Sequence, residues 1–372
     1  MQVGIPKELK SQEERVGSTP DGVASLVAAG HQVLVESNAG IGSGYTNQQY
    51  IEAGAEITSV DQVWNSKMII KVKEPIAAEY KYFKEGQIIY TYLHLAANRP
   101  LTEALMASGV TGVAYETMVG ENGDLPLLYP MSQIAGRMSV QVGAHFLEEP
   151  HQGKGLLLGG VPGVRKGKVT IIGGGTVGVN AAKIAVGMGA DVTILDINAK
   201  RLAEIEDIFD GKIKTLMSND QNIAKCVQVS DLVVGAVLIP GAATPKLVTE
   251  EMIASMEPGS VVVDIPIDQG GLFETSIKAT THEDPIYLSH GVVHYTVANI
   301  PGAVPKTATE ALSSATMPYA VKIANEGIEK ASFNRTIRTG INTYQGQLTE
   351  QAVAQSLQMS FKDLHDLMNL EV

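Results

Sequence analysis

Three closely spaced glycines in the middle of the chain limit the possible folds more than any other feature. They are Gly173, Gly175 and Gly178, in the segment KVTIIGGGTVGVNAAKIAVGMGADVTILDIN. The apolar run before them is typical of a buried strand, and the run after them of a helix that ends near Gly187 and Gly189. A second apolar run, DVTILD, follows that helix. The segment therefore predicts a β-α-β unit of a parallel sheet, with the glycines at its first turn.

An acidic residue at the end of the second strand extends this pattern. Asp196 follows the last glycine at close to the spacing of about 20 residues that dinucleotide-binding units show. Gly173 would permit a tight turn, Gly175 the approach of a pyrophosphate, and Gly178 close packing of the helix on the strand. The N–H groups at the helix N-terminus would bind the phosphates, and Asp196 the ribose hydroxyls. A carboxylate repels a 2′-phosphate, which favours NAD, although the nearby Arg201 leaves NADP open. Glycines that serve only a turn are the alternative.

The length, charge and cysteine content set outer limits. The 372 residues exceed what one ordinary core holds and predict about two domains. A net charge of −12 argues against a nucleic-acid partner. The single cysteine, Cys226, excludes intramolecular disulfides. The eight histidines show no paired spacing typical of metal ligands, so we predict no metal site. Neither a signal peptide nor a membrane span of about 18 apolar residues is recognisable, so we expect a soluble, cytoplasmic protein.

Apolar runs that alternate with helical segments also fill residues 1–118. This alternation predicts the α/β class, with two doubly wound, Rossmann-like domains, mainly parallel sheets and a cleft between the domains. A predicted helix over residues 131–149 connects the two. Because helical segments return after residue 305, we expect a discontinuous substrate domain of residues 1–128 and 306–372, and a dinucleotide-binding domain of residues 129–305.

Three apolar runs of the first domain end in, or next to, ionisable residues. MIIKVK leads to Lys73, QIIYTYLHL to His94 and GVAYET to Glu116. Parallel strands present their carboxyl ends at one edge of a sheet, where ligands bind, so we predict that these side chains converge there. The alternative is that these residues are polar only because strand ends often reach water, with no role in ligand binding.

Three further strands are expected in the second domain, each ending where a ligand would lie. SDLVVGAVL leads to Val237 and Leu238, GSVVVDIPID to Asp268, and VVHYTVANI to Asn299. We expect Asp268 to be a buried carboxylate that contributes to the site. A carboxylate that only caps the following helix is the alternative.

The whole chain resembles the alanine dehydrogenase family. Besides the glycine turn, the resemblance lies in the motifs GIPKE, KVKEP, HLAA, AYET, PMSQIAGR, GGVPGV, LDIN, GAVLIPG, VDIPIDQGG and VANIPGAVPKT. The NAD-binding subunit of proton-translocating transhydrogenase, which acts with a membrane partner, shares some of these features. Where that subunit has a stretch like AQNGGN, this chain has IDQGGLFE, so the subunit is the less favoured alternative. A non-catalytic NAD-sensing protein is a third alternative, which the intact set of candidate catalytic residues disfavours.

The resemblance implies a reversible, NAD-dependent oxidative deamination of L-alanine to pyruvate and ammonia through iminopyruvate. Arg15 would clamp the substrate carboxylate, and Lys73 would hold that carboxylate or the developing carbonyl oxygen. His94, whose ordinary pKa of about 6.5 suits proton transfer near neutrality, would be the general acid/base, assisted by Asp268. Glu116 would orient Lys73. The resemblance also implies a homohexamer.

Further contacts are implied residue by residue. Met131 and Asn299 would join Glu116 in binding the substrate. Pro266, where the family often has alanine, would shift the loop before Asp268. The cofactor contacts would come from Ser132, Gly173, Gly175, Thr176, Val177, Gly178, Asp196, Arg201, Ser218, Val237, Leu238, Ile265, Asp268, Val297, Ala298 and Asn299.

Overall fold

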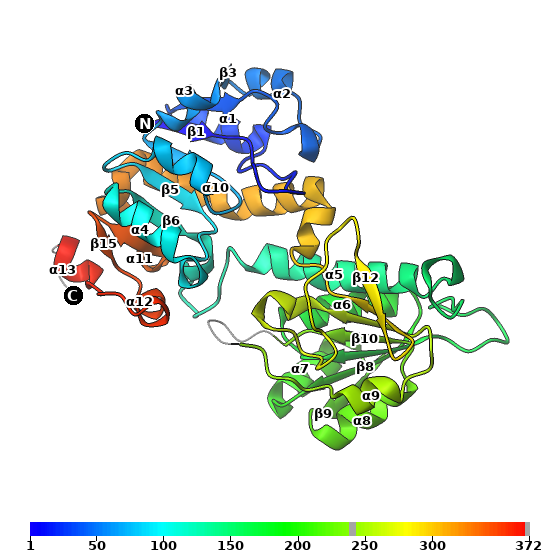
Figure 1. Ribbon diagram of the computed structural model, residues 1–372. Helices are drawn as coiled ribbons and strands as arrows, with labels where there is room; N and C mark the ends of the chain where they lie inside the picture. The colour runs from blue at the N-terminus through cyan, green and yellow to red at the C-terminus, as the bar shows by residue number, and fades with distance from the viewer. Residues whose placement is uncertain (238–242, 369–372) are drawn as a thin grey trace. The chain divides into compact units, whose positions relative to one another are not determined.

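The computed structural model describes residues 1–237 and 243–368 of the chain. Leu238, a predicted cofactor contact, therefore lies outside the described residues. The chain forms two compact units, one of Met1–Met131 with Val304–Val372 and the other of Ser132–Ala303. In Figure 1 the first unit comprises the blue-to-cyan and the orange-to-red elements, and the second unit the green-to-yellow ones. In the described part of the chain, no helix combines the length and apolar character needed to cross a membrane.

An eight-stranded sheet forms the centre of the first unit, in the order β15-β14-β6-β5-β4-β1-β2-β3. Strands β1 to β6 all run parallel, which confirms the fold class predicted from the alternating apolar runs. The strands are β1 (Gln2–Ile5), β2 (Gln32–Glu36), β3 (Glu56–Thr58), β4 (Met68–Ile70), β5 (Ile88–Thr91), β6 (Thr111–Ala114), β14 (Ile341–Tyr344) and β15 (Gln347–Leu348).

Helices accompany this sheet, and α1 shows how several of them begin at a capping residue. Before α1 (Pro20–Ala28), the hydroxyl of Thr19 accepts a hydrogen bond from the N–H of Gly22, and Pro20 fits the first turn, where its missing N–H costs nothing. The other helices of the unit are α2 (Asn47–Glu52), α3 (Val60–Trp64), α4 (Arg99–Ala107), α10 (Pro305–Ala331), α11 (Arg335–Gly340), α12 (Gln351–Leu357) and α13 (Leu364–Met368).

The C-terminal segment completes the first unit. β14 pairs antiparallel with β6, and β15 pairs antiparallel with β14. Leu348 and Val353 join Leu93 in one buried apolar cluster. The sequence predicts only helices after residue 305 and misses this hairpin, because its turn is formed by Gln345 and Gly346 (φ 47° and 75°) instead of the usual Asn-Gly or Asp-Gly pair.

A seven-stranded sheet forms the centre of the second unit, in the order β12-β13-β11-β10-β7-β8-β9. The predicted β-α-β unit is present as β7 (Lys168–Ile172), α6 (Thr176–Gly187) and β8 (Asp191–Asp196). After β9 the chain returns to pair β10 with the other side of β7, so the carboxyl ends of β7 and β10 form a switch point in strand order. The remaining elements are β9 (Lys214–Met217), β10 (Leu232–Gly235), β11 (Val261–Asp264), β12 (Ile286–Ser289), β13 (Val292–Tyr295), α5 (Tyr129–Phe146), α7 (Ala199–Phe209), α8 (Asp220–Val229) and α9 (Glu250–Ala254).

Several strands are shorter than predicted. The strand predicted to reach His94 ends at Thr91, and the strand predicted to reach Asn299 ends at Tyr295. His94 and Asn299 have φ values of 49° and 65°, which an extended strand does not admit. Apolar runs alone do not reveal such turns, because buried turn residues are as apolar as strand residues.

Candidate active site

His94 lies beyond the end of β5, at the carboxyl edge of the parallel sheet. It precedes a 3-10 turn (Leu95–Ala97) and has a left-handed backbone, with φ 49° and ψ 39°, which is uncommon for residues other than glycine. Glu116, in the turn after β6, stabilises this conformation. Its carboxylate accepts hydrogen bonds from the N–H groups of His94, at 2.5 Å, and of Leu93, at 3.1 and 3.2 Å. Glu116 thus binds the backbone beside His94, and its role in orienting Lys73 stays a prediction.

The imidazole of His94 pairs with Glu74, a carboxylate that the sequence reasoning missed. An oxygen of Glu74 lies 3.3 Å from Nδ1 of His94, and the other oxygen contacts Lys10. The ring of His94 is 47% exposed, so its desolvation is partial. This desolvation lowers the pKa of His94, but the hydrogen bond with Glu74 and the charges of Glu116 and Glu74 outweigh it and raise the pKa. Burial would raise the pKa of Glu74, yet His94 and Lys10 lower it to about 2.

Lys73 lies at the same edge, in the loop after β4. Its carbonyl accepts a hydrogen bond from Oγ1 of Thr91 at 3.1 Å, which holds the loop beside β5. Burial and the positive charge of Arg15 lower the pKa of Lys73. Its amine therefore loses a proton more easily than that of an exposed lysine, and perturbed pKa values of this kind are typical of functional sites.

Arg15 is almost fully buried, at 2% exposed. Its Nε and Nη2 donate to the two carboxylate oxygens of Glu13, each at 2.6 Å, and its Nη1 donates to the sulfur of Met131 at 3.2 Å. Burial opposes ionisation of Glu13, but the hydrogen bonds and charge of Arg15 lower its pKa. This bidentate pair fixes the plane of the guanidinium. Met131, a predicted substrate contact, therefore lies next to Arg15.

A second lysine of the same motif is structural. Lys71 is fully buried between Glu8, at 3.1 Å, and Glu79, at 2.9 Å. Glu8 also accepts hydrogen bonds from the N–H groups of Val72, at 2.6 Å, and Lys73, at 3.3 Å. Glu8, from the GIPKE motif, therefore shapes the loop that carries Lys73. The signal in the sequence was a lysine that interrupts the apolar run MIIKVK.

The glycine turn of the second unit lies between β7 and α6. Gly173 has a φ of 109°, and a Cβ there would lie 2.7 Å from the carbonyl oxygen of Ala236. A Cβ on Gly178 would lie 1.8 Å from the carbonyl oxygen of Gly173, so packing of α6 on β7 requires this glycine. Gly175 differs, because any residue can adopt its φ of −70° and ψ of −166°, and no atom of the described residues would lie within 4 Å of a Cβ there. Folding does not require a glycine at this position, whereas close approach of a ligand does.

Asp196 ends β8 beside this turn. Its Oδ2 accepts a hydrogen bond from the N–H of Gly174 at 2.7 Å, and its Oδ1 from the N–H of Asn198 at 2.9 Å. Arg201 donates from Nε to the carbonyl of Gly174 at 2.7 Å and from Nη1 to Glu204 at 2.8 Å. Asp196 and Arg201 therefore both stabilise the glycine turn.

Asp268 is exposed, and the prediction that it is a buried carboxylate is wrong. It lies in a 3-10 turn (Ile265–Gln269) after β11. The buried carboxylate at this strand end is Asp264, which accepts hydrogen bonds from the N–H groups of Leu272, at 3.0 Å, and Phe273, at 3.3 Å. The error arises because the run VVVDIPID contains two aspartates, and only the first belongs to the strand.

The other predicted residues divide between the two units. The first unit holds Arg15, Lys73, His94, Glu116 and Met131, and the second holds Asp268, Asn299 and the described cofactor contacts. The latter include Ser132 in α5, Thr176 and Val177 in the first turn of α6, Ser218 after β9, Val237 after β10, Ile265 after β11, and Val297, Ala298 and Asn299 after β13. The N–H of Ser218 donates to the carbonyl of Asp196 at 2.9 Å.

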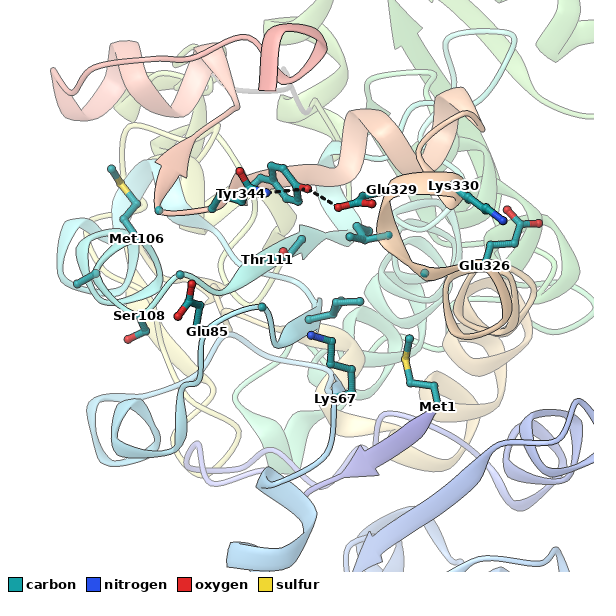
Figure 2. A pocket seen from close by; sticks show the side chains of 18 residues that line it. Met1, Lys67, Glu85, Met106, Ser108, Thr111, Glu326, Glu329, Lys330 and Tyr344 are labelled. Atoms are coloured by element: carbon teal, nitrogen blue, oxygen red, sulfur yellow. Dashed lines mark hydrogen bonds between the residues drawn. The ribbon is translucent and has the colours of Figure 1, made fainter. Parts of the chain in front are cut away.

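A pocket of about 780 Å³ opens near the amino ends of the strands in the first unit (Figure 2). Lys67 and Thr111 line it from those ends, and Glu329 and Tyr344 from the C-terminal segment. The hydroxyl of Tyr344 donates to Glu329 at 3.0 Å. Ligands of open α/β sheets bind at the carboxyl ends of the strands, so we do not assign the candidate active site to this pocket.

The fold and the two sets of residues define a class of protein. A doubly wound unit with a glycine turn between its first strand and helix is typical of dinucleotide-binding proteins, among them the dinucleotide-dependent oxidoreductases. The family model described as "Alanine dehydrogenase/PNT, N-terminal domain" matches residues 4–135, and the one described as "Alanine dehydrogenase/PNT, C-terminal domain" matches residues 139–351. The chain belongs to the alanine dehydrogenase/PNT family.

Individual proteins and solved structures resemble the chain over nearly its whole length. The chain is 59% identical to a protein named alanine dehydrogenase from Geobacillus stearothermophilus over 372 residues, which cover 99% of this chain and 100% of the relative. A solved structure named L-alanine dehydrogenase is 50% identical, with a TM-score of 0.94, over 96% of this chain and 99% of that chain. A transhydrogenase from Sinorhizobium meliloti is 24% identical, with a TM-score of 0.83, over 95% of this chain and 100% of that chain. At that identity the last match shows the fold alone, so the transhydrogenase alternative is less supported.

Proposed function

We propose that the protein catalyses the reversible, NAD-dependent oxidative deamination of L-alanine. L-alanine, water and NAD⁺ give pyruvate, ammonium, NADH and one proton. The observation that carries the proposal is the placement of Arg15, Lys73 and His94 in one unit, at the carboxyl end of its parallel sheet. They supply two cations for a carboxylate and one acid/base group. The name of the relatives, alanine dehydrogenase, supports the substrate.

The glycine turn supports NAD as the cofactor. The open space at Gly175 would admit the pyrophosphate, and α6 starts there without a side-chain cap, so its first N–H groups would bind the phosphates. NAD⁺ bound there would supply the nicotinamide as acceptor for the hydride that leaves Cα of the substrate. Asp196 would repel a 2′-phosphate, and Arg201 already binds Gly174 and Glu204. We therefore propose NAD in preference to NADP, bound by the second unit, while the first unit binds the substrate.

Two cations would hold the substrate. The guanidinium of Arg15 is fixed in its plane by Glu13, so it would clamp the carboxylate without losing further side-chain freedom. Lys73, whose pKa is lowered, would bind the same carboxylate or the carbonyl oxygen that forms.

His94 would move protons through Nε2. Glu74 lies next to Nδ1 and favours a proton on that nitrogen, which leaves Nε2 as the basic atom. Nε2 would accept a proton from the substrate amine, or from the water that adds to the imine, and return it to the leaving ammonia. We assign Asp268, on its exposed turn, to assistance in the water step.

The first prediction tests the activity itself. On addition of L-alanine, the purified full-length chain should reduce NAD⁺ and form one pyruvate and one ammonium per NADH. NADP⁺ should be reduced far more slowly, because of the carboxylate of Asp196. Absorbance of NADH, with pyruvate and ammonium measured separately, checks this. No NADH formation in the absence of a membrane partner would favour the transhydrogenase-type subunit.

The second prediction concerns pH. Glu74→Gln removes a negative charge from Nδ1 of His94, so the pKa of His94 should fall. The limb of the kcat/KM profile that titrates with His94 should therefore move to lower pH. Steady-state rates across a pH series measure this shift. Glu103→Gln, on an exposed glutamate paired with Arg99, is the matched control and should leave the limb in place. If this limb keeps its position in Glu74→Gln, or moves to higher pH, the pairing of Glu74 with His94 is contradicted.

The homohexamer implied by the resemblance and the cytoplasmic location expected from the sequence belong to the same proposal. Light scattering of the purified chain tests the first, and cell fractionation tests the second.

A further inference from the structure

Three side chains of the kind that bind metals meet at the C-terminal end of α5, in the second unit. They are His145, Glu148 and His151, and one potential ligand atom from each lies within 4.8 Å of the others. The centroids of the two imidazole rings are 3.8 Å apart, and Nε2 of His151 is 3.7 Å from the carboxylate of Glu148. The spacing of the histidines in the sequence does not predict this grouping.

The local backbone explains why the pairing is hidden in the sequence. The predicted helix over residues 131–149 ends already at Phe146. A 3-10 turn with Pro150 at its start follows, and it reverses the chain. The N–H of Glu148 donates to the carbonyl of His145 at 3.2 Å, and the N–H of His151 to that of Glu148 at 3.0 Å. In a continuous helix, positions 145 and 151 would face different directions.

The loop that carries these residues is firmly held. The ring of Phe146 packs at a tilt against that of Tyr295 of β13, with centroids 5.7 Å apart, and Leu147 is fully buried. The N–H of Gly153 donates to the carbonyl of Glu148 at 3.1 Å. A Cβ on Gly153 would lie 2.2 Å from the carbonyl of Phe146, so the chain closes tightly there. The backbone positions of the three ligand residues are therefore set before any ion binds.

We propose that His145, Glu148 and His151 form a binding site for one divalent transition-metal ion of the Zn²⁺ type. Two imidazoles and a carboxylate suit Zn²⁺, Co²⁺ or Ni²⁺, whereas Mg²⁺ and Ca²⁺ prefer oxygen ligands alone. Ligand atoms on one tetrahedral ion lie about 3.4 Å apart, given metal–nitrogen distances of about 2.0–2.1 Å.

The ligand side chains can reach that separation. The side chains of His151 and Glu148 are 37% and 57% exposed, so both can rotate to contract the cluster. Three protein ligands leave a fourth position for water or another small donor. The ion would tie the end of α5 to the loop that follows it and so stabilise the second unit.

Zinc titration of the tag-free, full-length chain tests the proposal. Isothermal titration should show one tight Zn²⁺ site per chain, and Zn²⁺ but not Mg²⁺ should raise the melting temperature. Loss of even an outer-shell partner typically weakens a metal site 10- to 100-fold, so His151→Ala and His145→Ala should each weaken Zn²⁺ binding at least about 10-fold. With Co²⁺ as the probe, the visible absorption of a tetrahedral complex should appear, and each variant should lose it.

A matched control separates this site from any exposed histidine. His290 is 37% exposed and pairs with Glu250 at 2.7 Å, but the structure groups no third ligand residue with them in the described part of the chain. His290→Ala should bind Zn²⁺ like the unsubstituted chain. The proposal is overturned if the unsubstituted chain shows no saturable site, or if His145→Ala and His151→Ala bind Zn²⁺ as tightly as it does.

Discussion

Replacement of His94 by asparagine is expected to lower turnover about 10²- to 10⁴-fold, which is the range that general acid–base groups contribute. Asparagine is the informative substitution because it removes the imidazole but tolerates the left-handed backbone at φ 49°. Alanine would add backbone strain of roughly 1–2 kcal/mol and blur the result. Affinity for NADH should not change, because the predicted cofactor contacts belong to the other unit. Steady-state kinetics of L-alanine deamination and a fluorescence titration with NADH measure the two effects.

His290 provides a matched control for this experiment too. It also has a left-handed backbone, with φ 51°, and its ring also pairs with a glutamate, Glu250. His290→Asn should therefore leave turnover unchanged. If His94→Asn keeps its turnover, or loses NADH affinity to the same degree as turnover, the acid/base role is wrong.

Gly175→Val is expected to weaken dinucleotide binding at least about tenfold, or 1.4 kcal/mol, without lowering the melting temperature. The reason is that a Cβ at this position meets no atom of residues 1–237 and 243–368 within 4 Å and needs no unusual backbone angle. The added side chain would instead occupy the space where the pyrophosphate approaches the turn. Calorimetric titration with NADH and a thermal melt of the same sample measure the two quantities.

Substitutions at two other glycines of α6 serve as controls for this prediction. At Gly187, in the last turn of α6, a Cβ also meets no atom of the described part of the chain within 4 Å, so Gly187→Val should affect neither NADH binding nor the melting temperature. At Gly178 a Cβ would lie 1.8 Å from a backbone oxygen, so Gly178→Ala should destabilise the fold by about 1–3 kcal/mol, as overpacking does. If Gly175→Val binds NADH like the unsubstituted chain, the turn is structural only.

The parts of the fold that could be predicted are those in which local pattern and tertiary structure agree. The β-α-β unit around Gly173 and Gly178 was predictable because the backbone within this short segment requires a glycine at both positions. The parallel direction of β1 to β6 was predictable because buried parallel strands are apolar throughout. The position of His94 at the carboxyl edge followed from that shared strand direction, but its left-handed turn did not.

The contacts of the carboxylates around the site could not be predicted, because their partners are distant in the sequence or belong to the backbone. Glu116 binds the N–H groups of a turn formed some way before it in the chain, and Glu74 binds His94 from the neighbouring loop. A sequence pattern reports which residues are apolar and how often, but it does not report which N–H group is left without a partner. For the same reason Asp264 and Asp268 could not be told apart in VVVDIPID.

During synthesis on a ribosome, the first unit stays incomplete until β14 has been made. Thr343 in β14 accepts a hydrogen bond from the N–H of Gly112 in β6, a residue made 231 positions earlier. Until β14 arrives, β6 is an open sheet edge that can pair with another chain. The second unit is continuous from Ser132 to Ala303 and can fold as it emerges. The part made first is therefore finished last, and the newly made chain depends longest on protection from aggregation at the β6 edge.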